Sequence, residues 1–394
     1  MKLLRSWLMP LVAMMALAAM LAYLLMWPVP IEPVAWSAPV DLGHTGAHSE
    51  NQRLAKLHTW ALKGDQEGPE HITSYQGTLY TALSNGDIVS FKPDGSSEVL
   101  ANTGGRPLGM EPTPDGTLYI ADAMKGLLSI NLTGGTPHLR TLLDKIDHPL
   151  PDDRIRYADA VGIDVRGNVW LTDASRRFSA KDNGGTFEAS VLDILEGSCT
   201  GRVIVMDPNT GRHRVALTGL CFPNGMAFTP DGRSMLLSET GRYRILKIDL
   251  ANLSVARSAQ GMTRVPSLQD ALKQGAAKVL IDNLPGFPDN VTRGENGRFW
   301  TGLTKPRGKV VDFAADKPWL RELTLRLPRA LWPVPKAYGH IFAFDENGQI
   351  LDDLQDPSGA YPETTAATEV GGKLFVQSLN SRSVGWLPYS GPQR

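Results

Sequence analysis

The sequence is poor in the residue types on which several common kinds of site depend. Only two of its 394 residues are cysteines and its eight histidines are scattered, so no cluster of thiolate or imidazole ligands favours zinc. No glycine-rich phosphate loop and no HExxH motif occurs. Charge of one sign is also lacking, because 40 basic residues balance 41 acidic ones and leave a net charge of −1. That balance excludes a nucleic acid or an acidic polymer as the partner.

Charge is missing altogether from one segment near the N-terminus. Residues Trp7 to Trp27 contain no charged side chain, and a helix of this length reaches roughly the 30 Å of a bilayer's hydrocarbon core. A signal peptide usually has a shorter apolar stretch that ends at small residues, whereas this one ends in Leu-Leu-Met-Trp-Pro. Residues 1–27 are therefore predicted to form an uncleaved transmembrane anchor.

Lysine and arginine are absent for a long way after this span. Lys2 and Arg5 precede it, and the next such residue is Arg53. The positive-inside rule then predicts a single-pass membrane protein with a cytoplasmic N-terminus. Everything after Trp27 is expected in the periplasm, a lumen or the extracellular space. Residues 28–50 are rich in Pro, Ala and Gly without periodicity, which indicates a linker.

Helical periodicity is scarce in residues 51–394, whereas Gly and Pro are frequent and short apolar runs are bounded by Asp-Gly or Asn-Gly turns. The runs align as six units that begin near residues 69, 106, 157, 222, 287 and 362. Six sets of short strands predict an all-β, six-bladed β-propeller, a ring that leaves no long sheet edge exposed. A strand-like segment at residues 53–62 precedes the first unit and is expected to complete the last blade.

Two insertions interrupt the repeat, at residues 176–198 in the third unit and at residues 304–339 in the fifth. Apolar residues in the second insertion could form a helical stripe, made of Trp319, Leu320, Leu323, Leu327, Leu331 and Trp332. Two interpretations follow. Either the stripe packs on the core as a lid, which is the ordinary role of such a stripe, or it contacts the membrane or an apolar substrate.

Several long motifs resemble one known family. They are GRPLGMEPTPDGTLYIADAMKGLL, GRVIVMDPNTGRHRVALTGLCFPNGMAFTPDG, SETGRYRI and LPGFPDNV. Over roughly residues 50–390 the sequence is similar to the strictosidine-synthase-like branch of the gluconolactonase and paraoxonase superfamily, which includes adipocyte plasma membrane-associated protein. The resemblance implies a six-bladed propeller, in agreement with the repeat, and the same plan of anchor and propeller.

Propellers of this superfamily commonly hold a calcium ion in the central channel, bound by oxygen atoms from the first turns of several blades. This sequence offers oxygen ligands at the matching places, each at the start of the first strand of a unit: Glu70, Asp159, Asn224, Asp289 and Asn290. The resemblance therefore implies Ca²⁺, with Mg²⁺ or Mn²⁺ as alternatives that also prefer oxygen. The competing interpretation is that these residues only form turns and caps at strand ends.

A calcium ion in such a channel can polarise the carbonyl of an ester or lactone, which supports a metal-dependent hydrolase of these small molecules. Asp159 or Asp289 is a candidate general base. The histidine that paraoxonases use beside the metal corresponds to Leu108 here, and the catalytic glutamate of strictosidine synthases corresponds to Thr365. Leu108 in place of the histidine keeps open a non-catalytic scaffold or binding propeller with structural calcium. Thr365 in place of the glutamate disfavours amine–aldehyde condensation.

The two cysteines flank a predicted hairpin. Its strands, RVIVMD and HRVAL, meet at the turn PNTG of residues 208–211, and Cys199 and Cys221 are nearly equidistant from its centre. In an oxidising compartment the pair can close across the two strands. A Cys199–Cys221 disulfide is therefore predicted, with two buried free thiols as the alternative.

Overall fold

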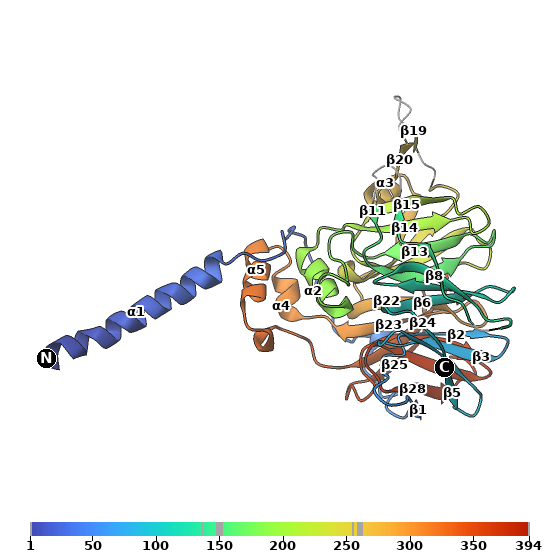
Figure 1. Cartoon of the computed structure of the whole chain (residues 1–394), viewed down its shortest axis with the longest axis horizontal. Coiled ribbons are helices and arrows are strands. Elements are labelled where there is room, and N and C mark those ends of the chain that lie inside the picture. Colours follow the sequence, from blue (N-terminus) through green and yellow to red (C-terminus); the bar gives the residue numbers. More distant parts are fainter. Residues whose placement is uncertain (1, 136, 147–152, 254–255, 258–262, 393–394) are drawn as a thin grey trace.

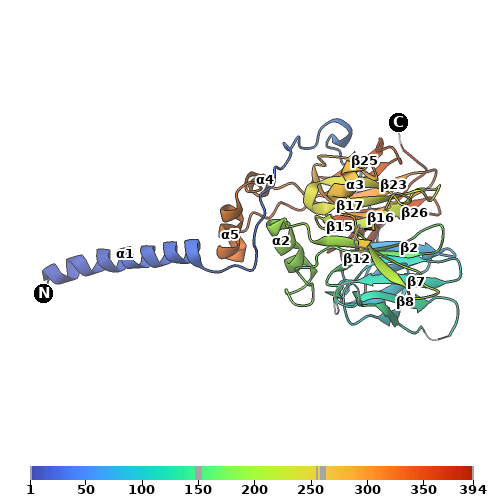
Figure 2. The same ribbon diagram turned by 90° about the horizontal axis from the view of Figure 1, so that it is seen from above.

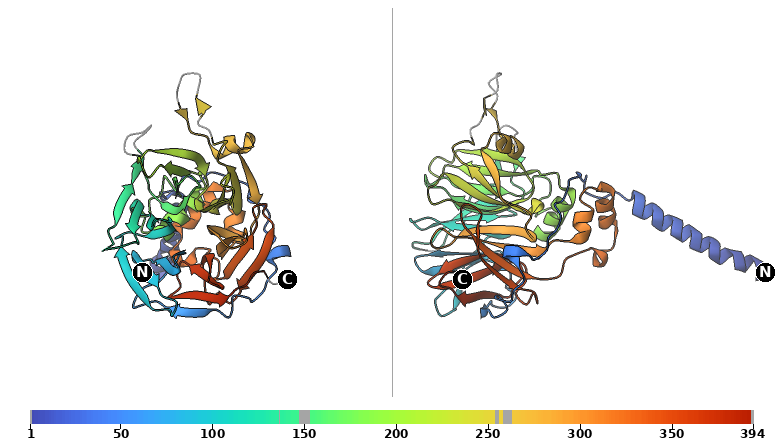
Figure 3. Two further views of the ribbon diagram at one scale, coloured as in Figure 1. Left: turned by 90° about the vertical axis from the view of Figure 1, so that its right-hand side faces the viewer. Right: turned by 180° about the vertical axis from the view of Figure 1, so that it is seen from behind.

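The structure, a computed structural model, describes residues 2–135, 137–146, 153–253, 256–257 and 263–392. Six four-stranded antiparallel sheets stand around a central axis, which the left view of Figure 3 shows end-on. The predicted all-β, six-bladed propeller is thus confirmed. A long N-terminal helix projects from one side of the ring (Figure 1).

The six blades follow one another along the chain. Blade 1 contains β2 (His71–Tyr75), β3 (Thr78–Ala82), β4 (Asp87–Phe91) and β5 (Ser97–Asn102). Blade 2 contains β6 (Pro107–Pro112), β7 (Thr117–Asp122), β8 (Gly126–Asn131) and β9 (Arg140–Leu143). Blade 3 contains β12 (Ala158–Ile163), β13 (Val169–Asp173), β14 (Gly201–Met206) and β15 (His213–Leu220).

The second half of the ring is built in the same way. Blade 4 contains β16 (Pro223–Phe228), β17 (Ser234–Glu239), β18 (Arg244–Asp249) and β21 (Ala277–Ile281). Blade 5 contains β22 (Gly286–Arg293), β23 (Phe299–Pro306), β24 (Gly339–Phe344) and β25 (Ile350–Asp356). Blade 6 contains β26 (Thr364–Val370), β27 (Lys373–Ser378) and β28 (Ser383–Pro388), and its fourth strand is β1 (His58–Ala61).

Smaller elements lie outside the six four-stranded sheets. Two short ladders pair β10 (Lys145–Ile146) with β11 (Asp153–Arg154) and β19 (Ala256–Arg257) with β20 (Thr263–Arg264). The remaining helices are α2 (Thr186–Glu196), α3 (Leu268–Lys273), α4 (Lys309–Phe313) and α5 (Pro318–Arg326), with 3-10 turns η1 (Gly46–His48), η2 (Thr240–Arg242) and η3 (Arg329–Leu331).

The ring is closed by a strand from the other end of the chain. β1 pairs antiparallel with β28, from His58 opposite Trp386 to Ala61 opposite Ser383. This strand lies within the segment 53–62 that was expected to complete the last blade. Without it, the edge of β28 would expose its unpaired backbone groups to water and to other chains.

Acidic residues that end the second strand of a blade hold the start of the first strand. Asp122 accepts a hydrogen bond from the backbone N–H of Arg106 at 3.1 Å, and Asp173 accepts one from that of Tyr157 at 2.9 Å. Glu239 makes the equivalent contact in blade 4. In blades 2, 3 and 4 these buried carboxylates are therefore committed to the backbone.

Apolar side chains fill the space between neighbouring blades. One cluster joins Tyr119 and Ala121 of blade 2 to Val161, Leu171 and Ile204 of blade 3, all at least nine-tenths buried. Full burial of a side chain such as Val or Leu stabilises a fold by about 1.5–3 kcal/mol. Because every blade shares such a cluster with the next, the first strands are held at fixed positions around the axis.

Both predicted insertions lie on the side of the ring from which the N-terminal helix projects (Figures 1 and 2). The first forms α2, between β13 and β14, and the second forms α4, α5 and η3, between β23 and β24. The apolar stripe expected in the second insertion does not pack on the core as a whole. Trp319 and Leu331 are 62% and 63% exposed, whereas the buried side chains of α5 are Arg321, Thr324 and Arg326.

The arginines of α5 are buried because they bind backbone carbonyl groups. The Arg321 guanidinium donates to the carbonyl oxygens of Leu195 at 3.0 Å, Val34 at 2.7 Å and Ala315 at 3.0 Å. Hydrogen bonds of this kind compensate for the burial of a charge. The helix therefore buries the polar side chains of Arg321, Thr324 and Arg326 most deeply and leaves Trp319 outside, while Leu325 packs against the core.

The N-terminal helix α1 (Lys2–Met26) has the properties of a membrane span. Its stretch Met9–Met26 has a mean hydropathy of 2.2, and none of that stretch is buried against the protein. The linker expected at residues 28–50, called the strap below, does connect α1 to the propeller, but it is packed against the ring. Ile31 is 4% exposed, and the N–H groups of Val34 and Trp36 donate to the carbonyls of Glu196 and Ala315.

Candidate metal centre

The first strands of five blades are interrupted at the same step. The pairing with the second strand shifts between Pro107 and Met110, Ala158 and Val161, Pro223 and Met226, Pro288 and Val291, and Thr364 and Ala367. In blade 1, β2 pairs without a shift, and Glu70 directly precedes it. A bulge redirects the side chains within it, and bulges are frequent beside active sites.

These steps hold the residues that the sequence proposes as metal ligands. Asp159, Asn224, Asp289 and Asn290 lie within the bulges, and Glu70 lies at the matching step of blade 1. All five are buried, with at most 6% of their surface exposed. The first strands contact one another around the axis, so residues far apart in the sequence surround one channel.

A glycine allows two of these strands to approach closely. A Cβ atom on Gly225, which follows Asn224, would lie 2.1 Å from the backbone nitrogen of Val291 and 2.3 Å from the Cα atom of Asn290. No larger residue fits this position without moving β16 away from β22. The Pro-Asn-Gly sequence thus contributes both a candidate ligand and the space that brings it beside the next blade.

Three oxygen atoms of the predicted ligands have no hydrogen-bond partner. They are Oε2 of Glu70, Oδ1 of Asn224 and Oδ1 of Asp289. Buried polar atoms in folded proteins almost always have partners, since burial of an unpaired polar group costs free energy. Three unpaired acceptors around one channel therefore fit a cation that binds oxygen.

The electrostatics of the carboxylates lead to the same expectation. Burial raises the pKa of Glu70 to about 7, although Arg106 and a hydrogen bond from Asn290 act in the opposite direction. Burial raises the pKa values of Asp159 and Asp289 well above the ordinary range, and repulsion from neighbouring carboxylates adds to each shift. Three negative charges in a buried channel are unfavourable unless protons or a cation neutralise them.

The channel carboxylates form a wider group than a closed metal cluster. Their ligand atoms do not all lie within 4.8 Å of one another; among the described residues, only His48, His340 and Asp353 meet that condition. Oxygen ligands on opposite sides of a calcium ion lie roughly 5 Å apart, because each Ca–O distance is about 2.3–2.6 Å. A group of this width is compatible with a cation held by oxygens on opposite sides.

Glu70 is positioned by residues of blades 5 and 6. The Asn290 amide donates to the Glu70 Oε1 atom at 3.0 Å, and the Thr365 hydroxyl donates to its backbone carbonyl at 2.6 Å. Asn290 thus uses its Nδ2 atom on Glu70 and leaves its Oδ1 atom as its possible metal ligand. Thr365, at the place of the synthase glutamate, is buried and holds Glu70, and Leu108 packs in an apolar cluster beside Ala123.

The candidate ligands form a first ring around the channel. The sequence analysis missed another set of residues, called the second ring below. Two positions before each bulge residue, five side chains line the wall of the channel mouth: Arg106, Tyr157, Phe222, Phe287 and Glu363. The repeat register contains the signal that could have found them, because the same offset recurs in every unit from the second to the sixth. Their chemical types differ too much for a composition pattern to reveal them.

Glu70, Asp159, Asn224 and Asp289 lie at the base of a pocket of about 470 Å³, and the second ring lines its wall. Phe187 and Ile194 of α2, Val311 of α4 and Trp332 and Val334 of the second insertion line its upper part. Lys305 forms an ion pair with Glu363 on the wall. A polar base beneath a largely apolar mouth is typical of a site for a small molecule with an apolar group. A larger hollow of about 1010 Å³ lies between the outer parts of blades 3 and 4, and none of these ring residues lines it.

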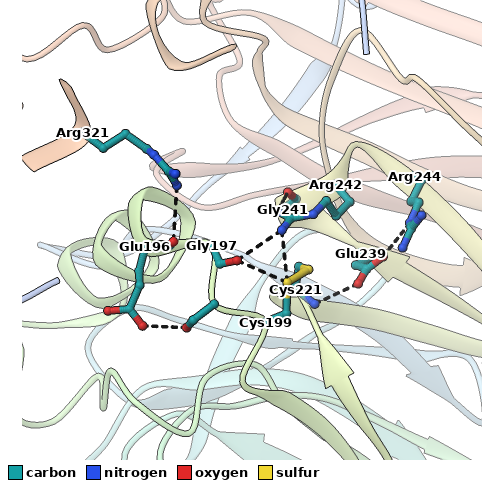
Figure 4. Close-up of a disulfide and its surroundings, with 10 residues drawn as sticks. Glu196, Gly197, Cys199, Cys221, Glu239, Gly241, Arg242, Arg244 and Arg321 are labelled. Carbon is teal, nitrogen blue, oxygen red and sulfur yellow. Dashed lines mark hydrogen bonds and ion pairs between the residues drawn. A yellow bond between two sulfur atoms is a disulfide. The ribbon is translucent and has the colours of Figure 1, made fainter. Parts of the chain in front are cut away.

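Cys199 and Cys221 form a disulfide in the structure, the pairing predicted from the sequence (Figure 4). The bond joins the segment before β14 to the end of β15. Arg242 lies beside it, with Nη2 3.1 Å from the Cys199 sulfur and 3.2 Å from the carbonyl oxygen of Gly197. The same guanidinium stacks on Trp36 of the strap at 4.2 Å. The disulfide thus lies at the junction of blade 3, blade 4 and the strap.

The cluster of His48, His340 and Asp353 fastens the strap to blade 5. The Asp353 Oδ2 atom contacts Nδ1 of His48 at 2.7 Å and Nε2 of His340 at 2.8 Å. Asn51 and Gln355 donate to the other oxygen of Asp353. All four contacts are hydrogen bonds that satisfy the carboxylate without an ion, so the cluster is explained as a structural clasp.

Comparisons with known proteins agree with this geometry. A family model described as strictosidine synthase matches residues 159–251, and the model of the strictosidine synthase-like N-terminal region matches residues 46–91. The chain is 28% identical over 375 residues to the adipocyte plasma membrane-associated protein of Danio rerio, across 89% of this chain and 82% of that protein. It is 31% identical over 291 residues to strictosidine synthase-like 13 of Arabidopsis thaliana, across 72% of this chain and 62% of that protein.

Solved structures share the fold at low identity. A gluconolactonase of Xanthomonas campestris is 16% identical, with a TM-score of 0.53 over 92% of this chain and 99% of that protein. A calcium-binding protein of Agrobacterium tumefaciens, regucalcin, is 15% identical, with a TM-score of 0.52 over 85% of this chain and 95% of that protein. The apolar helix α1 and the membrane-associated relatives fit a single-pass membrane protein. In its motifs and its relatives the chain is similar to strictosidine-synthase-like proteins, and its fold is a six-bladed propeller.

Proposed function

We propose that the protein is a membrane-anchored, calcium-dependent hydrolase of small esters or lactones. The observation that carries this proposal is the set of unpaired oxygens of Glu70, Asn224 and Asp289 at the base of the pocket. Such a set provides the ligands that a hard cation requires, beneath a cavity that can receive a substrate. The gluconolactonase with the same fold adds support at the level of architecture.

Glu70, Asp159, Asn224, Asp289 and Asn290 would hold the ion. A bound Ca²⁺, or Mg²⁺ or Mn²⁺ in its place, would supply Lewis-acid polarisation of the substrate carbonyl. The five residues come from four blades, so the rigid ring sets the positions of their oxygens before any ligand arrives. Preorganisation of this kind lets polar groups stabilise a developing charge without further rearrangement.

The second ring gives the pocket its selectivity. Tyr157, Phe222 and Phe287 present aromatic surface to the apolar part of a substrate. Arg106 is buried, and its Nη1 atom has no acceptor, so this nitrogen can donate to the negative charge that develops on a carbonyl oxygen. Asp159 or Asp289 can accept the proton of an attacking water through an oxygen that is not a ligand.

A binding propeller with structural calcium is the second candidate function. Leu108 favours it, because this buried, apolar residue stands where paraoxonases have their histidine and cannot transfer a proton. The names of the adipocyte plasma membrane-associated relatives state no activity. An amine–aldehyde synthase is disfavoured, since Thr365 uses its hydroxyl to hold the backbone of Glu70.

Full-length Asn224→Ala and Asn224→Asp proteins would test the metal site and the activity together. Calcium that binds only the folded state raises the melting temperature by mass action. We expect a smaller calcium-dependent rise in Asn224→Ala than in wild type, and an undiminished rise in Asn224→Asp, whose carboxylate adds charge. Hydrolysis of aryl esters and lactones should be lost with a chelator, regained with calcium, and weakened in Asn224→Ala.

Asn347→Ala is the matched control, because Asn347 is an exposed turn residue of blade 5. An equal calcium-dependent rise in Asn224→Ala and wild type would contradict the ligand assignment. A normal rise in wild type without hydrolysis of any ester or lactone would instead support the binding propeller.

A further inference from the structure

Exposed apolar side chains gather on one surface of the propeller. Among the described residues after residue 50, nine large hydrophobic side chains are exposed, and six of them lie on the two insertions. These six define the anchor-side face: Phe187, Val310, Phe313, Trp319, Leu331 and Val334, between 40% and 63% exposed. The other three are single aliphatic residues on other loops and strands, whereas every aromatic member of the nine belongs to this face. A concentrated patch of this kind normally marks an interaction surface.

The anchor-side face is attached directly to the end of the candidate membrane span. The Arg326 guanidinium of α5 donates to the backbone carbonyls of Trp27 at 2.7 Å and Leu24 at 3.4 Å, at the end of α1. Figure 2 shows α4 and α5 between α1 and the blades. If α1 crosses a bilayer, its last turn reaches the bilayer surface. The hydrogen bonds then leave no flexible spacer between that surface and α5.

The rest of the insertions cannot easily turn away from that position. Arg321 joins α5 to the carbonyls of α2 and the strap, as described above, and it is 1% exposed. Asp312 of α4 accepts hydrogen bonds from Tyr243 of blade 4 and from Arg307. The anchor-side face therefore has a fixed orientation relative to the ring and to the end of α1.

Basic side chains lie among the apolar ones, two of them with an ion-pair partner: Arg329 with Glu188 and Lys317 with Asp316. Lys309, Lys336 and Arg329 are exposed beside the apolar patch, and Arg329 lies over Phe187 at 5.6 Å. Lys317 lies over the ring of Phe313 at 4.1 Å. Tryptophan, phenylalanine and basic residues are the side chains that settle at the boundary between headgroups and acyl chains.

From these contacts we infer that the propeller docks its anchor-side face on the surface of the bilayer that holds α1. The docked position places Trp319 and Phe313 in the headgroup region. It also turns the pocket mouth toward the lipid, because Phe187 and Val334 belong both to the anchor-side face and to the pocket wall. The inference concerns the surface alone and does not depend on the proposed hydrolysis.

Quenching of tryptophan fluorescence can locate the face. The full-length protein is reconstituted in vesicles of phosphatidylcholine and phosphatidylglycerol, with or without lipid that carries a doxyl quencher near the headgroup end of its acyl chain. The emission of Trp319 is obtained as the difference between wild type and Trp319→Phe. We expect this component to be blue-shifted, to lose most of its intensity with the doxyl lipid, and to be little affected by iodide in the water.

The matched control is the difference between wild type and Trp386→Phe. Trp386 is partly exposed and stacks on His58 in blade 6, away from the insertions. Its emission should be unchanged by the doxyl lipid. Quenching of Trp319 by iodide and not by the doxyl lipid would overturn the inference, since the face would then be in water. Protection of Trp319 from both quenchers would overturn it too, because a second protein surface would then cover the face.

Discussion

At the scale of single residues, the site is governed by competition between protons and a cation for the same oxygens. Glu70 illustrates this most clearly. The residue is 1% exposed, one carboxylate oxygen accepts from Asn290, and the other has no partner. A group in this position must be neutralised by a proton or balanced by a metal ion, so its protonation and metal binding are linked.

The pH dependence of stability should reveal this linkage. The folded pKa of Glu70 is raised to about 7 from an ordinary value of 4.5. Between these values the folded state binds more protons than the unfolded state, so stability without calcium should fall as the pH rises through this window. Asp159 and Asp289 act in the same direction. With saturating calcium the fall should be reduced or reversed, and melting curves in calcium and in chelator measure both slopes.

Glu70→Gln should weaken the pH dependence in chelator and reduce the rise in melting temperature caused by calcium. The amide cannot take up a proton and carries no charge for the ion. Glu98→Gln, at an exposed glutamate of β5, is the control and should behave like wild type in both measurements. Identical slopes for Glu70→Gln and wild type would show that another group governs the titration.

At the scale of elements, the disulfide cross-links the two ends of the β14–β15 hairpin in blade 3. It closes a loop between residues 22 positions apart that contains the hairpin of β14 and β15. A cross-link of this span restricts the unfolded chain and stabilises the fold by about 3 kcal/mol. Its neighbours, Arg242 and Trp36, connect it to the strap.

We therefore expect a double Cys199→Ser and Cys221→Ser protein to be less stable than wild type by about 3 kcal/mol in denaturant unfolding. A reductant should lower the stability of wild type toward that of the variant and leave the variant unchanged. Wild-type stability that does not respond to complete reduction, verified by thiol labelling, would show that the bond contributes little to folding.

The structural elements differ in how well they could be predicted from the sequence. The blades and the closing strand were predictable because each unit repeats an apolar strand, a glycine turn and a second apolar strand. Glu70, Asp159, Asn224 and Asp289 were predictable because they share one register. The orientation of α5 was not, because periodicity reports which residues share a helix face and not which face is buried. Arg321 is buried by carbonyl groups of segments remote in sequence, and no local pattern contains them.

At the scale of the whole molecule, the orientation of the candidate membrane span α1 would decide the compartment in which the ring works. Lys2 and Arg5 precede the span and no Lys or Arg follows it until Arg53, which favours export of the propeller. The disulfide agrees with an oxidising compartment. We expect alkaline phosphatase fused after Arg394 to be active in a bacterial host, because that reporter needs export.

The converse fusion, with a fluorescent protein that matures only in the cytoplasm, should be dark after Arg394. Exchange of the basic residues to the other side of the span, with Lys2 and Arg5 removed and two lysines placed after Trp27, should weaken or reverse this pattern. Phosphatase activity absent from the original fusion and fluorescence present would place the propeller in the cytoplasm.

Because β1 closes the ring by pairing with the last strand, folding can be completed only after the whole chain has been synthesised. His58 pairs with Trp386, 328 positions later in the chain, so the first strand to be synthesised must wait for the last. Bringing such distant segments together costs about 5 kcal/mol of chain entropy, and topologies dominated by remote contacts fold slowly. During that delay the nascent chain carries five complete blades beside an open sixth. The strap shortens the search, because its contacts with α2 and blade 5 can hold β1 near the gap before β28 arrives.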